Sequence, residues 1–243
     1  MSLDVDRYFT DWQSVYSKLN WTKSEVDITD EHGVFLFKQK DVEFPEFYSP
    51  VARKIVASRY FYGENGTPER EYSMRQLVER VSETFSSWAV KQVYMDEGQA
   101  EIFRDELAFL SLNQRMSFNS PVWFNVGTER YESAKSNEKK SGFIIKDGKA
   151  ISIPTGQNYL YPQTSACFIQ DVEDTMESIM DLAVREAMLF KHGSGTGTNL
   201  STLRSAREKL SGGGKPSGPL AYEIFYDKLA SIVQAGGKTR RAA

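Results

Sequence analysis

The stretch from Gln163 to Arg204, QTSACFIQDVEDTMESIMDLAVREAMLFKHGSGTGTNLSTLR, indicates how the chain is organised. A short apolar run that contains Cys167 is followed by acidic residues, a helical pattern and a glycine-rich segment. A strand, a helix and a glycine turn in this order would bring a thiol, a helix N-terminus and bare backbone close together. Such an arrangement suits a phosphorylated small molecule beside a redox-active sulfur.

The helical pattern spans residues 175–191. Asp174 is the predicted N-cap, with Glu177 three residues later as in a capping box. Apolar residues cover so much of the helix surface that we expect burial on two sides, in the core or against a partner helix. The predicted apolar face consists of Met176, Ile179, Met180, Ala183, Ala187 and Phe190.

Each polar or reactive group in this stretch has two interpretations. Cys167 is either an inert core residue or a reactive thiol, and Asp174 either caps its helix or binds a ligand. The segment GSGTGTN (193–199) is either a helix C-cap with a tight turn or an oxyanion-binding loop. A cationic cluster follows that is either a solvated face or a triphosphate clamp, formed by Arg204, Arg207 and Lys209.

The rest of the chain reads as a mixture of helices and strands. We predict a helix followed by a polar turn over residues 1 to about 30, and further helices over 73–93, 96–116 and 219–234. Predicted strands cover 34–37, 165–170 and 198–204. Residues 118–127 have short β-like and turn character, and a hairpin is predicted around Lys146 to Lys149.

Composition excludes several classes of protein. The net charge of −3 comes from 30 basic and 33 acidic residues without a block of one sign, so we expect no nucleic-acid or membrane partner. A single cysteine forbids an internal disulfide, which fits a cytoplasmic location. Cys167, His32 and His192 lack the spacing of a metal site, so we expect no bound structural metal.

Seven segments, taken in order, resemble one family. They read FPEFYSPVARKIVASRYFYG, GTPEREYSMRQL, NQRMSFNSPVWFNVG, TSACFIQDVEDTMESI, GSGTGTNLSTLR, LSGGGKPSGPL and GGKTRRAA. Together they are similar to the N-terminal part of adenosylcobalamin-dependent (class II) ribonucleotide reductases, from about residue 30 to the end of the chain. The resemblance implies an α/β fold, in which a helical region precedes a ten-stranded α/β barrel of the ribonucleotide reductase type. Residues 1–116 would form the mainly helical region and 117–243 the first half of the barrel.

The same resemblance implies roles for individual residues. Cys167 matches the first of two redox cysteines that reduce the ribose. Residues matching the substrate-binding positions are Ser120, Ser165, Ala166, Ser194 and Gly195.

A second set of residues matches an allosteric site for a deoxynucleoside triphosphate (dNTP) effector. Asp174, Thr175 and Arg204 correspond to effector contacts, and the helix over 175–191 to the interface of a homodimer. A specificity loop that links effector and substrate would contain Gly236, Gly237, Lys238, Arg240 and Arg241.

The implied activity is the conversion of ribonucleoside di- or triphosphates to deoxyribonucleotides by radical chemistry with adenosylcobalamin. The family's radical cysteine and most of its cobalamin site fall outside this sequence, so we expect the chain to need a C-terminal half for activity. The ending GGKTRRAA favours a split gene, an intein or a deliberate truncation. The alternative is a nucleotide-binding regulatory or structural module without catalysis.

Overall fold

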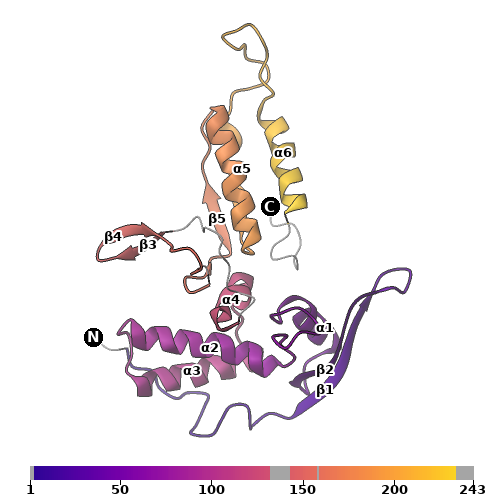
Figure 1. Cartoon of the computed structure of the whole chain (residues 1–243), viewed down its shortest axis with the longest axis vertical. Coiled ribbons are helices and arrows are strands. Elements are labelled where there is room, and N and C mark those ends of the chain that lie inside the picture. Colours follow the sequence, from indigo (N-terminus) through magenta and orange to yellow (C-terminus); the bar gives the residue numbers. More distant parts are fainter. Residues whose placement is uncertain (1–2, 132–142, 158, 234–243) are drawn as a thin grey trace. The chain divides into compact units, whose positions relative to one another are not determined.

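The computed structural model describes residues 3–131, 143–157 and 159–233. The chain forms two compact units, Met1–Gln163 and Thr164–Ala243, each described separately below (Figure 1). The division into a mainly helical region over 1–116 and the first half of the barrel over 117–243 stays a prediction.

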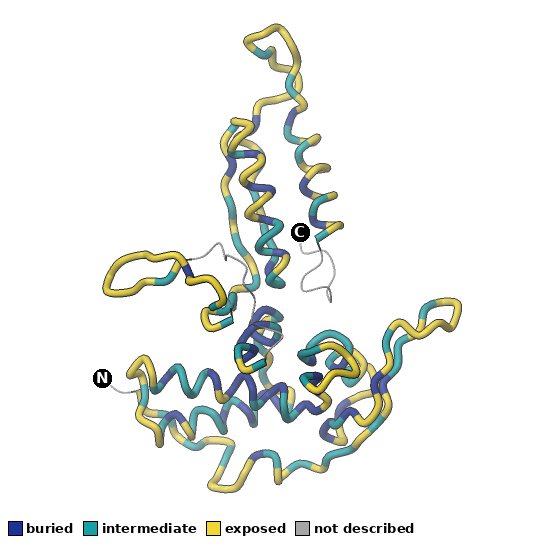
Figure 2. Tube along the Cα trace, viewed as in Figure 1, coloured by how far each residue is buried: buried dark blue, intermediate teal, exposed yellow. Residues whose placement is uncertain are grey.

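In the first unit, a long β-hairpin precedes the helices. Strands β1 (Trp21–Thr29) and β2 (Phe35–Pro45) pair antiparallel, and α1 (Pro50–Arg59) follows. Helices α2 (Met74–Lys91) and α3 (Glu97–Leu112) confirm the two predicted over 73–93 and 96–116. Their apolar faces meet along buried positions (Figure 2), because amphipathic helices are stabilised mainly by burying one stripe.

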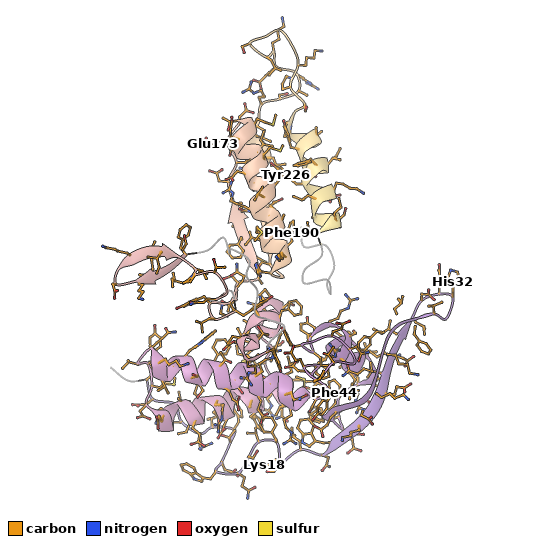
Figure 3. The ribbon with its side chains drawn as sticks, viewed as in Figure 1. Lys18, His32, Phe44, Glu173, Phe190 and Tyr226 are labelled. Carbon is orange, nitrogen blue, oxygen red and sulfur yellow. The ribbon has the colours of Figure 1, made fainter. Side chains whose placement is uncertain are left out.

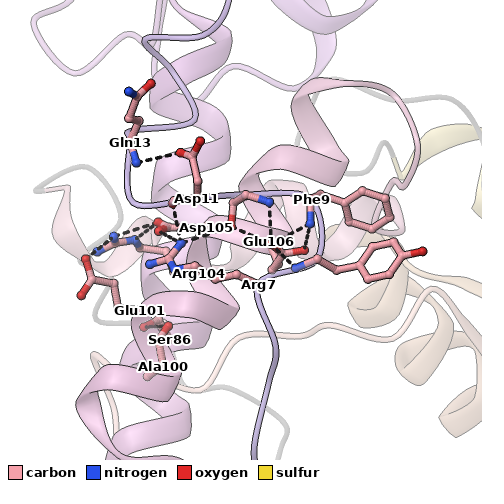
Figure 4. Close-up of polar contacts among 12 residues, drawn as sticks. Arg7, Phe9, Asp11, Gln13, Ser86, Ala100, Glu101, Arg104, Asp105 and Glu106 are labelled. Carbon is pink, nitrogen blue, oxygen red and sulfur yellow. Dashed lines mark hydrogen bonds and ion pairs between the residues drawn. The ribbon is translucent and has the colours of Figure 1, made fainter.

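The helix predicted at the start of the segment 1–30 is wrong. The described residues up to 20 form turns and bends, and Trp21–Thr29 is a strand. The turns are held on α3, because the buried carboxylate of Glu106 accepts hydrogen bonds from the backbone N–H groups of Tyr8, Phe9 and Thr10 (Figure 4). The Phe9 ring also stacks on Phe109 with centroids 5.4 Å apart. These tertiary contacts outweigh the helical spacing of the aromatic residues.

The β-like reading of residues 118–127 is also wrong, because α4 (Ser120–Asn125) is a short helix. Asn119 caps it by accepting from the N–H of Val122, and Pro121 occupies the first turn, where its missing N–H costs nothing. A 3₁₀ turn (Thr128–Arg130) follows.

The predicted hairpin is confirmed as β3 (Phe143–Lys146) and β4 (Lys149–Ser152). Its turn residues Asp147 and Gly148 both have positive φ, 52° and 72°. This is the backbone that a two-residue type I′ hairpin requires, and Asp-Gly favours it.

The second unit contains β5 (Cys167–Gln170), α5 (Met176–Lys191), β6 (Gly195–Thr198), a 3₁₀ turn (Leu200–Thr202) and α6 (Pro219–Ile232). The helices predicted over 175–191 and 219–234 are confirmed. The strand predicted over 198–204 is wrong, because the glycine-rich segment before it forms the strand instead. Phe190 and Tyr226 are buried in this unit, as Phe44 is in the first (Figure 3).

Strands β5 and β6 pair in parallel, and α5 connects them. Parallel neighbours need such a crossover, so this is one βαβ unit, the repeating element of α/β folds. The structure is mixed α and β, as expected, and the described residues of the second unit contain this one βαβ unit. The ten-stranded barrel stays a prediction.

Candidate functional site

The parallel register of β5 and β6 determines what surrounds the cysteine. Cys167 lies opposite Gly195, and Ile169 lies opposite Gly197. Since side chains alternate between the faces of a strand, these four residues share one face of the pair. Cys167 is exposed, Ile169 is 96% exposed, and a Cβ added to Gly197 would meet no atom within 4 Å. The thiol therefore stands on an open face beside bare backbone.

The N-terminal ends of these strands hold four of the five predicted substrate residues. The Ser194 hydroxyl donates to the carbonyl of Ser165 at 2.7 Å, and the N–H of Gly195 donates to the carbonyl of Ala166 at 2.6 Å. Ser194 is fully buried, so its hydroxyl serves to join the two chain segments. The structure thus brings Ser165, Ala166, Ser194 and Gly195 together beside Cys167.

The fifth predicted substrate residue, Ser120, lies in the first unit at the start of α4. Its hydroxyl is 3.1 Å from the hydroxyl of Tyr60, whose ring stacks on Phe124. Tyr60 and Trp123 also line a cavity of about 380 Å³ within that unit.

The predicted effector residues come together at the opposite end of the second unit's strands. Arg204 donates from Nε to Asp174 Oδ2 at 2.5 Å, and Thr175 begins α5. Thr175, not Asp174, is the N-cap, because its hydroxyl accepts from the N–H of Ser178. Asp174 as the cap was wrong, and the ion pair with Arg204 explains why its carboxylate points elsewhere. The loops that follow the carboxyl ends of parallel strands are the usual place for ligands in α/β sheets.

Glu186 was not foreseen as part of the site. It lies on α5 on the far side of the strands from Cys167, only 4% exposed, and its Oε1 accepts from Thr196 at 2.8 Å and Thr198 at 3.4 Å. The available sequence signal was a charged residue on the same helix face as Ile179 and the other apolar residues of α5. These bonds fasten α5 to β6, the strand that carries Gly195.

Tyr226 connects α6 to the same helix. Its hydroxyl donates to the carbonyl of Ile179 at 2.8 Å. Burial, assisted by the nearby charge of Glu186, raises the pKa of Tyr226 to about 12. The phenol is therefore neutral at physiological pH and acts as a hydrogen-bond donor between the helices.

The specificity-loop residues Gly236, Gly237, Lys238, Arg240 and Arg241 lie outside the described residues. Within the described ranges, no cluster of three or more His, Cys, Asp or Glu side chains could hold a metal ion. The described helices also include none that is long and apolar enough to cross a membrane.

Two family profiles match the chain. The one described as class II vitamin B12-dependent ribonucleotide reductase matches residues 22–114, and the ribonucleotide reductase barrel domain matches residues 165–243. The chain belongs to the vitamin B12-dependent ribonucleotide reductase family. The barrel-domain profile covers the whole βαβ unit of this chain, including Cys167.

The curated relatives that the chain matches are much longer than it. A vitamin B12-dependent ribonucleotide reductase from Rhodopirellula baltica is 48% identical over 235 residues, which is 96% of this chain and 22% of that protein. One from Streptomyces avermitilis is 42% identical, with 94% of this chain and 21% of that protein aligned. A vitamin B12-dependent ribonucleoside-diphosphate reductase from Mycobacterium tuberculosis is 38% identical, with 98% of this chain and 28% of that protein aligned. The chain spans about a fifth of the length of the first two.

Proposed function

We propose that the chain is the part of a ribonucleotide reductase that carries one redox cysteine, part of the substrate pocket and the allosteric specificity site. The observation that supports this most directly is the exposed thiol of Cys167 on an open strand face, beside Gly195 and the joined Ser165 and Ser194. A small, bare surface beside a thiol gives a ribose room to approach the sulfur.

The proposed reaction reduces C2′ of the ribose. Two thiols are oxidised to a disulfide, the 2′-hydroxyl leaves as water, and C2′ gains a hydrogen, so two electrons pass from sulfur to carbon. Cys167 supplies one thiol. Since the sequence has a single cysteine, the second thiol comes from another part of the reductase, the C-terminal half in our proposal.

The proposed substrate is a ribonucleoside di- or triphosphate. Ser120, Ser165, Ala166, Ser194 and Gly195 are the proposed contacts, through hydroxyl and backbone N–H donors that suit ribose and phosphate oxygens. The relative from Mycobacterium tuberculosis is named for the diphosphate.

The proposed effector is a dNTP. Its phosphates would interact with Arg204, and its sugar hydroxyl with Asp174, next to Thr175 at the N-terminus of α5. A guanidinium and a helix N-terminus both favour phosphate, and a carboxylate accepts a hydrogen bond from a hydroxyl. The specificity loop over residues 236–241 is part of this proposal.

Adenosylcobalamin is the proposed cofactor of the complete reductase, where it supplies the radical that starts the reaction. In our proposal most of the cobalamin site belongs to the C-terminal half of the reductase.

The test is a Cys167→Ser substitution in the complete reductase. Because serine cannot form the disulfide, we expect steady-state deoxynucleotide formation to fall by several orders of magnitude. Substrate and effector binding should stay near wild-type values, which shows that the fold is intact. Unchanged multiple turnover in the serine variant would overturn the role of Cys167.

A further inference from the structure

Tyr60 and Ser120 form a hydrogen bond that joins two helices of the first unit. The phenol oxygen of Tyr60 lies 3.1 Å from Ser120 Oγ. Tyr60 directly follows the last residue of α1, and Ser120 is the first residue of α4. Since 60 residues separate them in the sequence, the contact depends on how the unit folds.

Helix α4 also holds the ring of Tyr60. Phe124 lies four residues after Ser120, so the two side chains share one face of the helix. The Tyr60 ring stacks on Phe124 with centroids 5.2 Å apart and an angle of 24° between the rings. The backbone N–H of Tyr60 donates to the carbonyl of Val56 on α1. Together these contacts fix the direction in which the phenol points.

The chemistry of the two hydroxyls indicates which of them donates. A phenol O–H is a stronger acid than an aliphatic O–H, so Tyr60 is the better donor and Ser120 the better acceptor. A serine hydroxyl carries one hydrogen and can accept while it donates. Among the described residues, this hydrogen finds no acceptor other than Tyr60, and Ser120 is only partly buried. When Tyr60 donates, the Ser120 hydrogen is left for an acceptor outside the chain.

We propose that Tyr60 is a positioning residue for substrate binding, because its donation to Ser120 Oγ directs the Ser120 hydrogen toward a phosphate oxygen of the ribonucleotide. The inference rests on the substrate contact proposed above for Ser120 and adds the residue that orients it.

A phosphate oxygen is the acceptor that suits this arrangement best. Hydrogen bonds to an ionised acceptor are about twice as strong as those between neutral groups. A hydroxyl that already accepts a hydrogen bond is also polarised into a better donor. Since the phosphate takes no part in the reduction at C2′, loss of the contact weakens substrate binding and leaves the chemical step unchanged.

The experiment is a double-mutant cycle of Tyr60→Phe and Ser120→Ala in the complete reductase, with CDP and CTP as substrates at a fixed dNTP concentration. Tyr60→Phe keeps the ring that stacks on Phe124 and removes only the O–H. We expect it to raise KM about three- to ten-fold, the scale of one hydrogen bond, at an unchanged kcat. In the Ser120→Ala background the same substitution should change KM by less than about two-fold, because Tyr60 acts through Ser120.

Tyr72→Phe is the matched control, since Tyr72 belongs to the same unit and is 48% exposed. Its KM should equal that of the wild type.

Three results would overturn the proposal, and they separate its failure from that of the substrate contact. An unchanged KM in Tyr60→Phe, with a raised KM in Ser120→Ala, would remove the role of Tyr60 and leave the contact in place. Equal effects of Tyr60→Phe in both backgrounds would show that Tyr60 does not act through Ser120. Unchanged kinetics in Ser120→Ala would remove the proposed substrate contact itself.

Discussion

The roles of single residues in this chain depend on partners that lie far away in the sequence. Asp174 and Thr175 are adjacent and both are good N-caps. Thr175 becomes the cap and Asp174 turns to Arg204, 30 residues further along the chain. The pairing of Asp174 with the distant Arg204 therefore explains which of the two neighbours became the cap. Capping rules based on neighbouring residues do not include such a contact.

Gly127 is a residue whose replacement has a clear expected cost. It has φ of +74°, and an added Cβ would lie 2.5 Å from Thr84 Oγ1 and 2.6 Å from the carbonyl oxygen of Arg80. Gly127→Ala combines a left-handed backbone with a clash against backbone, so we expect a loss of at least about 2–3 kcal/mol in the free energy of unfolding. Chemical denaturation measures it.

Gly33 is the matched control for this substitution. It has φ of +80°, but an added Cβ would meet nothing within 4 Å. Gly33→Ala should therefore lower the free energy of unfolding only by the cost of the left-handed backbone, about 1 kcal/mol. Similar losses for the two alanine variants would contradict the assigned clash.

Glu79 should make stability depend on pH. Burial, followed by repulsion from Glu83, raises the pKa of Glu79 above its ordinary value of 4.5. A carboxyl whose pKa is raised in the folded state does not destabilise the fold below its ordinary pKa. As pH rises through the raised pKa, its ionisation lowers the free energy of unfolding. Glu79→Gln should therefore raise the melting temperature at pH 7, with a smaller gain near pH 4.

The exposed Glu64 provides the control, because Glu64→Gln removes the same charge from a solvated position in the same unit. We expect its melting temperature to follow the wild type at both pH values. A Glu79→Gln gain that is as large at pH 4 as at pH 7 would rule out the titration of this carboxyl as the cause.

At the scale of elements, α4 illustrates how a short helix is held in place. Isolated helices of this length are unstable in water, so tertiary contacts must support it. Arg80 on α2 is fully buried and donates to the carbonyls of Val126 at 2.6 Å and Trp123 at 3.0 Å. The same guanidinium donates to Glu71 at 2.7 Å. One buried cation thus secures the end of the helix that begins at Ser120.

Arg80→Met should consequently destabilise the first unit strongly. It leaves the buried Glu71 carboxylate without its cation and two carbonyls without their donor, and we expect a loss of about 3–5 kcal/mol. Lys38→Met is the control, because Lys38 pairs with Glu25 on the surface, where a pair contributes about 0–1 kcal/mol. Urea denaturation of both variants gives the comparison, and equal losses would disprove the anchoring role.

At the scale of the whole molecule, helix α5 presents an apolar stripe to solvent within its own unit. Met176, Met180 and Val184 are 58%, 41% and 61% exposed at positions four residues apart. Exposed stripes of this kind mark interaction surfaces. This is consistent with the homodimer through helix 175–191 that the family resemblance implies.

Val184→Lys is expected to weaken that self-association. Burying a lysine in an apolar interface is unfavourable, so the sedimentation coefficient should shift from that of a dimer toward that of a monomer. Val93→Lys is the matched control, since Val93 is 82% exposed and lies outside α5. A monomeric wild-type chain, or equal effects of the two lysines, would count against the interface.

The sequence by itself determined those features that depend on neighbours along the chain. The periodicity of apolar residues located α2, α3, α5 and α6, and Asp147-Gly148 located a hairpin turn. Ordered motifs indicated the family, which the two profiles bear out.

Only the tertiary structure decided which distant residues meet. The N-terminal segment forms turns because Glu106 accepts hydrogen bonds from its backbone N–H groups. Strands β5 and β6 pair so that Cys167 lies beside Gly195. Buried Glu186 and the Asp174–Arg204 pair likewise join residues from separate elements. The physical reason is that propensity and turn chemistry act over a few residues, whereas strand pairing, burial and charge pairing are settled by the folded chain as a whole.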